Sequence, residues 1–329
     1  MYLLKKLFNP DIFQGRYKKK NYFEGWYFKI IDRNMKNVLA VIPGVSFDKH
    51  KKDSHAFVQV MDAHSCKVNY LKYDISAFKF NKDKFEIEIG DNYFSDKEIR
   101  LFIKDDVLSI QGRLKFENII AYPKTIWRPG VMGPYTFIPF MECYHGIVNI
   151  HHDIYGQLNI DGSEIDFSNG YGYIEKDWGR SFPEAWIWLQ SNHFKKDDVS
   201  VMFSLAKIPW LGRYFMGLIS FIRIKDKTYR FATYTKAKVL ELNYINNSLK
   251  VILADRKYKL ELNARHSNVG ILKAPKNGLM QREVLESITA VVNVRLSDKE
   301  DNTIYEGIGT NTGLEIESGI FKYYENRED

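Results

Sequence analysis

From Asn21 onward, the chain reads as a series of short runs in which apolar and polar residues alternate. Examples are YFEGWYFKII, HAFVQVMD, DISAFKF, FEIEIG, IRLFIK and LSIQGRLKF. Alternation with a period of two, broken by turn residues, is typical of β-strands with one buried face. Asp161-Gly162, between QLNI and SEIDF, predicts a two-residue hairpin. The only helices we expect are short, at Met1 to Phe8 and near Met280 to Glu286.

The composition agrees with a fold rich in strands. Of the 329 residues, 45% are apolar and 15% are aromatic, a bias that favours sheets and provides flat surfaces for an apolar ligand. The chain also echoes itself at a shift of roughly 160 residues. FEGWYFKII falls on PEAWIWLQS, so that Glu24 and Trp26 match Glu184 and Trp186.

This echo predicts an all-β fold of two similar antiparallel barrels packed together, because closed barrels also remove exposed sheet edges. The predicted division is a basic extension at 1–20, a first barrel at 21–180 and a second barrel at 181–329. The alternative is that any two meander sheets look alike. A small barrel can enclose one apolar ligand, which suits a lipid-like substrate.

The charge pattern limits the classes of binding partner that we expect. The net charge is +7, but the 48 basic and 41 acidic residues are interspersed apart from the run Arg16 to Lys20. No nucleic-acid reader motif accompanies that run, so we expect no nucleic acid and a weak attraction to anionic membrane surfaces. No apolar stretch approaches the roughly 18 residues of a membrane span. MYLLKKLFNP does not resemble a signal peptide, and we expect a cytoplasmic protein with Cys66 and Cys143 as free thiols.

The segment from Gly170 to Phe194, GYGYIEKDWGRSFPEAWIWLQSNHF, combines acids, indoles and amides. Burying acids beside indoles is costly unless they are paired or neutral, and such a cost points to chemistry. Alternation gives two sets that each share a face: Tyr171, Tyr173, Glu175 and Asp177, then Trp186, Trp188, Gln190 and Asn192. Arg180 lies in the turn between them, where the alternative to a substrate contact is a salt bridge to Glu175 or Asp177.

Glu24 lies between Tyr22 and Trp26 on the apolar face of the strand Tyr22 to Ile31. A carboxyl in such a setting can be kept protonated and serve as a proton donor. The alternative is that Glu24 caps the strand or forms an ion pair at the barrel end.

A second polar group contains Cys143, His145, His151, His152 and Asp153. On one strand His145 and His151 would lie roughly 20 Å apart, too far to share an ion. We therefore predict no metal and keep His145 as a base or orienting donor. The sequence contains no phosphate-binding loop, Cys-x-x-Cys pair or nucleophile elbow, so we predict no cofactor.

Five motifs occur in one order across residues 21 to 318: YFEGWYFK, MGPYTFIPFMECYHG, GYGYIEKDWGRSFPEAWIWLQSN, LKAPKNGLMQREVLESI and IYEGIGTNTGLEI. Together they resemble the tocopherol cyclases of vitamin E synthesis and their bacterial relatives. The resemblance implies a pair of lipocalin-like barrels. It also implies acid-initiated cyclisation of a prenylated quinol to a chromanol, an intramolecular lyase or isomerase reaction on a lipophilic small molecule. Because only a short segment precedes the first motif, we expect a bacterial-type member without a chloroplast targeting segment.

Such a ring closure protonates an alkene and captures the tertiary cation with a phenolic oxygen. It needs an acid that is protonated near neutral pH, a dry pocket and aromatic faces. The candidate catalytic residues are Asp177, as first choice, Glu24, Glu175 and His145. The candidate substrate-binding residues are Trp26, Trp178, Trp186, Trp188, Gln190, Asn192, Tyr173 and Arg180.

Two other functions fit the same residues. One is a non-catalytic carrier of a lipophilic quinone or isoprenoid, which needs barrels and aromatics but no buried acid. The other is an isoprenoid double-bond hydratase or isomerase, in which the same cation has a different fate. The sequence leaves the oligomeric state open.

Overall fold

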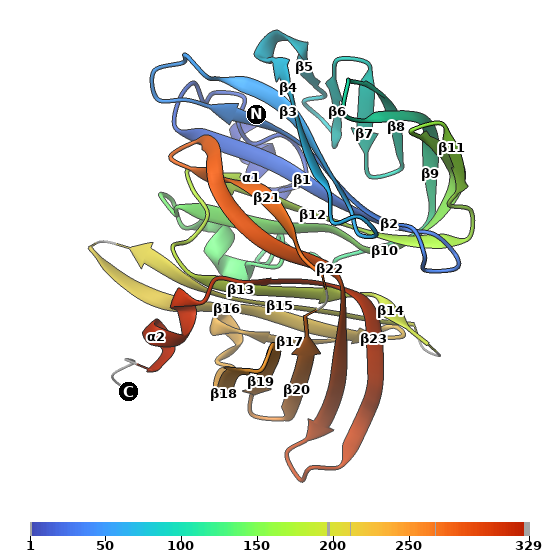
Figure 1. The fold of residues 1–329 in the computed structure, drawn as a ribbon. Helices are drawn as coiled ribbons and strands as arrows, with labels where there is room; N and C mark the ends of the chain where they lie inside the picture. The colour runs from blue at the N-terminus through green and yellow to red at the C-terminus, as the bar shows by residue number, and fades with distance from the viewer. Residues whose placement is uncertain (1, 196–197, 211, 267, 326–329) are drawn as a thin grey trace. The chain divides into compact units, whose positions relative to one another are not determined.

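The computed structural model describes residues 2–195, 198–210, 212–266 and 268–325. In these ranges the chain consists mainly of antiparallel β-strands (Figure 1). The α-helices described there are α1 (Tyr2–Phe8), which the sequence predicts, and α2 (Gly319–Glu325). None of the described helices is both long and apolar enough to span a membrane.

The chain divides into two compact units. The first consists of Met1–Phe182 and Ile271–Glu283, and the second of Pro183–Gly270 and Val284–Asp329. Residues 1–20 therefore belong to the first unit rather than forming a separate extension. Residues 271–283 also belong to it, although the predicted boundaries place them in the second barrel. A hydrogen bond of 2.7 Å from Lys273 N to Gln59 Oε1 is one contact that ties this hairpin to the first unit.

The first unit is built on a twelve-stranded sheet. Its strands are β1 (Tyr22–Ile31), β2 (Val38–Phe47), β3 (His55–Asp62), β4 (Val68–Asp74), β5 (Phe78–Phe80), β6 (Glu86–Ile89), β7 (Asn92–Ser95), β8 (Glu98–Lys104), β9 (Ser109–Ala121), β10 (Cys143–Ile160), β11 (Ser163–Asp166) and β12 (Gly170–Gly179). The order is β4-β3-β2-β1-β12-β10-β9-β8-β7-β6-β5, with β11 paired to β10. The outermost strands, β4 and β5, are joined by the 3-10 turn η1 (Ile75–Ala77), so the path nearly closes into a barrel.

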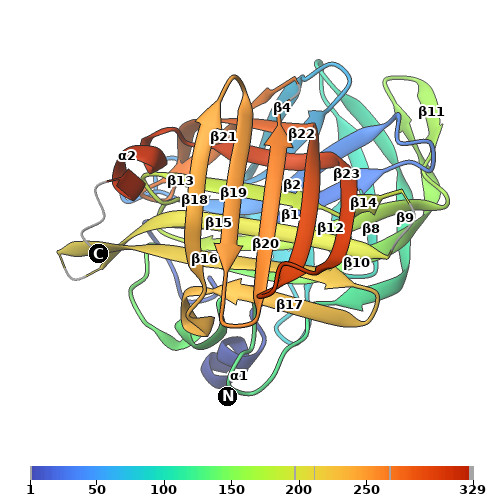
Figure 2. The same ribbon diagram turned by 90° about the horizontal axis from the view of Figure 1, so that it is seen from below.

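The second sheet has eleven strands and follows the same plan. Its strands are β13 (Trp186–Ser191), β14 (His193–Phe194), β15 (Val199–Trp210), β16 (Arg213–Ile224), β17 (Lys227–Ala232), β18 (Lys238–Ile245), β19 (Ser248–Ala254), β20 (Tyr258–Arg265), β21 (Gly270–Lys276), β22 (Leu279–Asp298) and β23 (Thr303–Ile316). The order is β17-β16-β15-β13-β23-β22-β20-β19-β18, and Figure 2 shows β18, β19 and β20 side by side. The end strands β17 and β18 are again joined by a short 3-10 turn, η3 (Thr233–Thr235).

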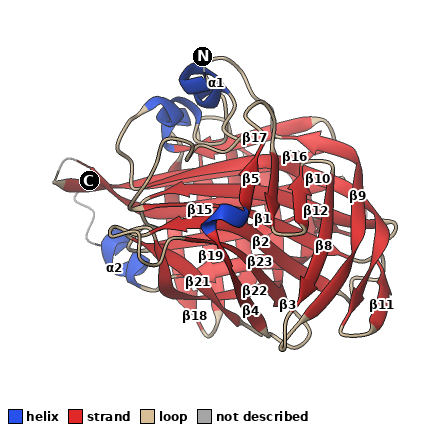
Figure 3. Cartoon of the chain, turned by 90° about the horizontal axis from the view of Figure 1, so that it is seen from above, coloured by secondary structure: helices blue, strands red, loops and turns tan. Residues whose placement is uncertain are grey.

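The two sheets therefore share one topology. In the first, β1 lies between β2 and β12; in the second, β13 lies between β15 and β23. The prediction of an all-β fold of lipocalin-like barrels is confirmed, and Figure 3 shows how little helix accompanies the strands. The predicted hairpin is also present, because Asp161 and Gly162 link β10 to β11 with φ of +50° and +85°.

One predicted element is wrong. Residues 280–286 form part of strand β22 instead of a helix. Here Val284 is buried while Leu285 is 54% exposed, and Glu286 pairs with Glu315 of β23. Pairing with a neighbouring strand thus outweighs any local helical propensity of this segment.

Each barrel has its own apolar core. Trp26, Phe28 and Ile30 of β1 belong to the first core, whereas Ile187 and Leu189 of β13 belong to the second. Trp186 is next to Ile187, and since side chains alternate along a strand it faces away from its core. The sequence echo thus aligns two equivalent strands but places Trp26 and Trp186 on opposite faces.

Candidate active site

Strand β12 presents different side chains to its two faces. Ile174 and Trp178 belong to the core of the first barrel, so Tyr173, Glu175 and Asp177 point to the outer face. Tyr173 and Glu175 are nevertheless buried, at 0% and 5% exposed. The structure therefore brings these predicted residues together on one buried outer face, as alternation along the strand predicts.

The neighbouring strand β10 adds the histidine. His145 is directly opposite Asp177 in the pairing of β10 with β12, and its Nδ1 is 2.9 Å from Asp177 Oδ1. Its Nε2 is 3.6 Å from Glu175 Oε2. The Tyr173 hydroxyl donates to that same Glu175 oxygen at 2.7 Å. Four predicted residues thus lie together, joined by two short contacts and one longer contact of 3.6 Å. We call them the acid–histidine cluster.

Burial shapes the proton affinities around this cluster. Loss of solvent, followed by the charge of Glu175, raises the pKa of Tyr173 well above its usual value. Burial, followed by the charge of Asp177, raises the pKa of the Cys143 thiol in the same way. Tyr173 is therefore a neutral hydrogen-bond donor and Cys143 is not a thiolate nucleophile. The side chains of His145 and Asp177 remain 13% and 22% exposed, so they are the accessible end of the cluster.

The same residues could hold a metal ion. Ligand atoms of His145, Glu175 and Asp177 lie within 4.8 Å of one another. One imidazole and two carboxylates are ligand types that Zn²⁺ and other divalent ions use. The prediction of no metal used only the spacing of histidines along one strand. This group is assembled across β10 and β12.

The other histidines of β10 have different neighbours. His151 Nε2 is 3.4 Å from Asp153 Oδ1. His152 is fully buried, with its Nδ1 2.8 Å from Asn149 Oδ1 and its ring 4.1 Å from that of Phe116. Burial lowers the pKa of His152 well below 6.5. This histidine is neutral in the folded chain.

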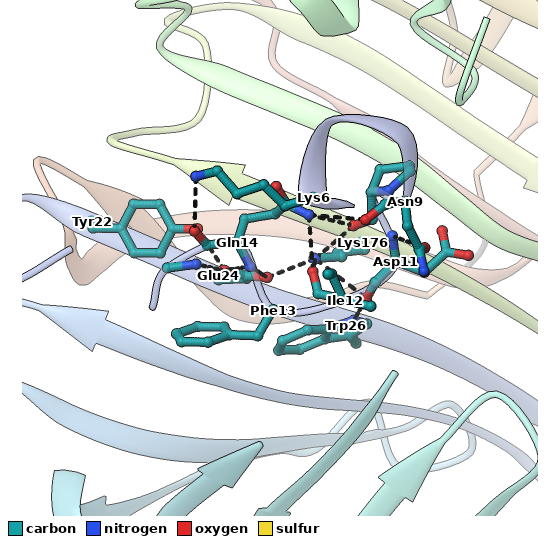
Figure 4. Close-up of polar contacts among 12 residues, drawn as sticks. Lys6, Asn9, Asp11, Ile12, Phe13, Gln14, Tyr22, Glu24, Trp26 and Lys176 are labelled. Carbon is teal, nitrogen blue, oxygen red and sulfur yellow. Dashed lines mark hydrogen bonds and ion pairs between the residues drawn. The ribbon is translucent and has the colours of Figure 1, made fainter. Parts of the chain in front are cut away.

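Glu24 has a different environment inside the first barrel (Figure 4). It is 0% exposed, and Lys176 Nζ is 2.6 Å from its Oε1. Backbone N–H groups of Gln14 and Gly15 donate to it at 2.8 and 2.9 Å, as does the Tyr22 hydroxyl. The carboxylate thus receives one ammonium contact and three hydrogen bonds from the surrounding groups. The geometry is that of a structural ion pair, the alternative considered from the sequence.

Lys176 fixes the N-terminal segment in place. Besides Glu24, its ammonium donates to the carbonyl oxygens of Pro10 at 2.8 Å and Ile12 at 2.6 Å. Trp26 Nε1 donates to the carbonyl of Asp11 at 3.2 Å. Residues 10–15 are therefore bound to the barrel, as Figure 4 shows. Burial lowers the pKa of Lys176, and Glu24 counteracts this effect.

Two of the predicted indoles also belong to this inner face. The Lys176 ammonium is 4.7 Å from the ring centroid of Trp26 and 4.9 Å from that of Trp178. Trp26 also stacks on Phe85 at 5.2 Å. The structure thus groups both indoles with Lys176 and not with Asp177, which points to the other side of the sheet.

Comparison with known proteins identifies the family. The model of the family described as tocopherol cyclase-like matches residues 109–318, more than half of the chain. The chain belongs to the tocopherol cyclase-like family. The resemblance inferred from the five motifs is confirmed.

Plant proteins are among the relatives of this tocopherol cyclase-like chain. It is 31% identical over 101 residues to a probable chloroplastic tocopherol cyclase of Oryza sativa subsp. japonica, covering 30% of this chain and 22% of the relative. It is 38% identical over 56 residues to a chloroplastic tocopherol cyclase of Zea mays, covering 17% of this chain and 12% of the relative. The matches thus span less than a quarter of each relative.

Solved structures with the same fold are more distant in sequence. CghA with Sch210972 gives a TM-score of 0.55 at 11% identity, over 90% of this chain and 88% of that chain. Kievitone hydratase from Nectria haematococca gives 0.51 at 9% identity, over 93% of each chain. These likenesses support the barrel fold of the tocopherol cyclase-like chain.

The family match also includes the predicted residues of the second barrel. Trp186 Nε1 donates to Glu315 Oε2 at 2.6 Å. Trp188 packs over Gly313, where an added Cβ would be 2.5 Å from the indole. Gln190 and Asn192 are 1% and 5% exposed. These side chains are held in a second buried group.

Sequence reasoning missed three charged residues. Lys176 lies between Glu175 and Asp177 in the sequence and was not predicted to have a role. Glu315 and Glu286 face each other across β23 and β22, and Glu286 is fully buried. Glu286 lies in the segment predicted as a helix and within the residues that the family model matches. Arg180, predicted to contact substrate or an acid, donates instead to Asn277 Oδ1 at 3.0 Å.

Proposed function

We propose that this tocopherol cyclase-like chain is an enzyme that protonates an alkene of a lipophilic prenylated phenol or quinol and closes a ring. The observation that carries the proposal is the acid–histidine cluster. It links two carboxylates through one imidazole on a largely buried face. Membership of the family and the names of its plant relatives support the same reaction class.

In this proposal Asp177 is the proton donor. It is the more accessible of the two carboxyls, and His145 can return a proton to it through the 2.9 Å contact. Glu175 and Tyr173 orient the imidazole from its other side. Glu24 has a structural role in this proposal, because its carboxylate is enclosed by the Lys176 ammonium and three hydrogen-bond donors.

The steps balance within one substrate molecule. The Asp177 proton moves to the less substituted alkene carbon, and the alkene π electrons form the new C–H bond, which leaves a tertiary cation. The phenolic oxygen then bonds to that cation and releases its proton to His145, from which it returns to Asp177. No atoms are gained or lost, so the overall reaction is an isomerisation.

Substrate binding would depend mainly on the prenyl tail. Each buried CH₂ contributes about 0.8 kcal/mol, so a long chain outweighs any single head-group hydrogen bond. Contact of Trp186 and Trp188 with a substrate stays a prediction from the sequence, based on the ability of indole faces to stabilise positive charge. Head-group binding by Gln190 and Asn192 likewise stays a prediction.

Hydration is a second candidate function, and one observation favours it. The side chains of Asp177 and His145 keep 22% and 13% exposure, so water can reach the place where the cation would form. Kievitone hydratase, whose fold is similar, carries that reaction in its name. The two reactions share the protonation step and differ in whether water or the phenol captures the cation.

Incubation with prenylated hydroquinones in D₂O under reducing conditions tests the proposal. A single chromanol enantiomer with one new carbon-bound deuterium supports cyclisation, and a product heavier by one D₂O supports hydration. Asp177→Asn is the matched negative control. Tight retention of the quinol without turnover would overturn the enzyme proposal in favour of a carrier.

A further inference from the structure

An exposed tight turn lies between β9 and β10 of the first barrel. Thr125 N donates to Arg128 O at 2.8 Å, and Arg128 N donates to Thr125 O at 3.0 Å. These two bonds fix Ile126 and Trp127 at the tip, where they are 72% and 80% exposed. Turn tips are normally polar, so a rigid tip made of Ile and Trp is a feature that folding does not require.

Phe140 is a third exposed apolar side chain of the same connection. It is 94% exposed, and its φ is +64°. A bulky residue in the left-handed region is strained, and such strain concentrates at functional positions. Exposure and strain coincide here at one aromatic side chain.

Helix α1 adds apolar side chains beside this connection. Leu4 is 65% exposed and Phe8 is 49% exposed. The Phe8 ring lies 5.8 Å from that of Phe137 in the β9–β10 connection. An ion pair between Lys124 and Asp11 joins the two segments again. We name this set the apolar rim; it consists of Leu4, Leu7, Phe8, Ile126, Trp127 and Phe140.

Positive charge accompanies the rim. Arg16, Lys18, Lys19 and Lys20 follow directly after the docked N-terminal segment and are all exposed, and Arg128 is exposed at the base of the turn. Protruding Trp, Phe and Leu side chains next to cations are typical of surfaces that enter the head-group region of anionic bilayers.

We propose that the first barrel docks on bilayers containing anionic lipids, with the apolar rim inserted into the interface and the basic run against lipid head groups. The exposed side chains of the rim come from three segments of the first unit, namely helix α1, the turn tip and Phe140. The exposed cations of the basic run and Arg128 match the negative charge of anionic lipid head groups. Docking also goes beyond the proposed chemistry, because it concerns where a lipophilic ligand is collected.

Sedimentation with vesicles of phosphatidylcholine and phosphatidylglycerol tests the docking. We expect the 329-residue protein to bind these vesicles. The double variant Ile126→Ser/Trp127→Ser should lower the partition coefficient by about tenfold or more. Phe140→Gly should also weaken binding while keeping or raising the Tm, since glycine relieves the positive φ. Lys19→Gln/Lys20→Gln should weaken binding at low salt and have little effect at high salt.

Phe102→Ser is the matched control, because Phe102 is a 47% exposed aromatic on β8 outside the rim. It should leave vesicle binding unchanged. Equal binding by wild-type and rim variants, or no binding by the wild type, would overturn the docking proposal. Turnover of detergent-solubilised substrate is measured in parallel, so that loss of docking and loss of chemistry are distinguished.

Discussion

The two faces of strand β12 carry two carboxylate–base pairs with opposite properties. On the inner face, Glu24 and Lys176 are sealed, with side chains 0% and 1% exposed, and surrounded by fixed donors and acceptors. On the outer face, Asp177 and His145 are partly exposed and belong to the acid–histidine cluster, for which we propose proton transfer. Similar residue types thus serve stability on one side and proposed chemistry on the other. The role of such a pair therefore depends on its surroundings and not on whether it lies in a conspicuous sequence motif.

The largest expected effect is on turnover at the outer face. Asp177→Asn should lower turnover by about 10²- to 10⁴-fold, the usual contribution of a general acid, with little change in Tm because Asp177 is partly exposed. Product chromatography and thermal unfolding measure the two quantities. Asp153→Asn is the matched control, since Asp153 lies beside His151 with similar exposure. Equal losses in both variants would remove the distinction drawn between the pairs.

At the inner face we expect an effect on stability instead. Lys176→Met leaves the Glu24 charge buried without its partner and should lower the free energy of unfolding by about 3–5 kcal/mol. Adding Glu24→Gln to the same chain should recover part of the loss. Urea unfolding checks both variants, and turnover per folded molecule should be unchanged. Loss of turnover without loss of stability would return Glu24 to the list of proton donors.

Strand β10 carries the partly exposed His145 and the fully buried His152. The pH dependence of stability should report on the buried one. Because burial holds the folded pKa of His152 well below 6.5, the unfolded chain takes up a proton below pH 6.5 that the folded chain does not. The stability therefore falls as pH drops from 6.5, by up to about 1.4 kcal/mol per pH unit for this group. Urea unfolding of the wild type and His152→Gln at several pH values should show a shallower slope in the variant. An identical slope would mean that other groups account for the acid sensitivity.

The smallest expected effect concerns metal. If the acid–histidine cluster transfers protons without an ion, EDTA should leave turnover unchanged. Added Zn²⁺ should inhibit, because binding to His145, Glu175 and Asp177 would occupy the proposed donor and its relay. Turnover assays with chelator and with added ion measure this directly. Activity that EDTA abolishes and Zn²⁺ restores would assign the cluster to metal chemistry.

The sequence predicts the fold and part of the cluster. Alternation with a period of two was sufficient to place Tyr173, Glu175 and Asp177 on one face. The contact with His145 required the pairing of β10 with β12, which has irregularities between Ile147 and His152. Such bulges change which side chains face each other and leave no clear pattern in one sequence.

Two other features could not be read from the chain for similar reasons. The Lys176 ammonium binds carbonyl oxygens of Pro10 and Ile12. Those contacts use the backbone and are independent of side-chain identity. The echo between Trp26 and Trp186 identifies equivalent strands but not equivalent faces, because a shift of one residue along a strand reverses its side chains.

The contact between Lys176 and Pro10 joins positions 166 residues apart in the chain. During synthesis, strand β1 leaves the ribosome long before its neighbour β12 has been made. Glu24 therefore stays exposed to water until Lys176 is available to pair with it. The barrel can close only when nearly the whole first unit has been made. We therefore expect the N-terminal segment to be the last part of that barrel to become protected, and proteolysis of ribosome-bound chains that stop before residue 176 should cleave it readily.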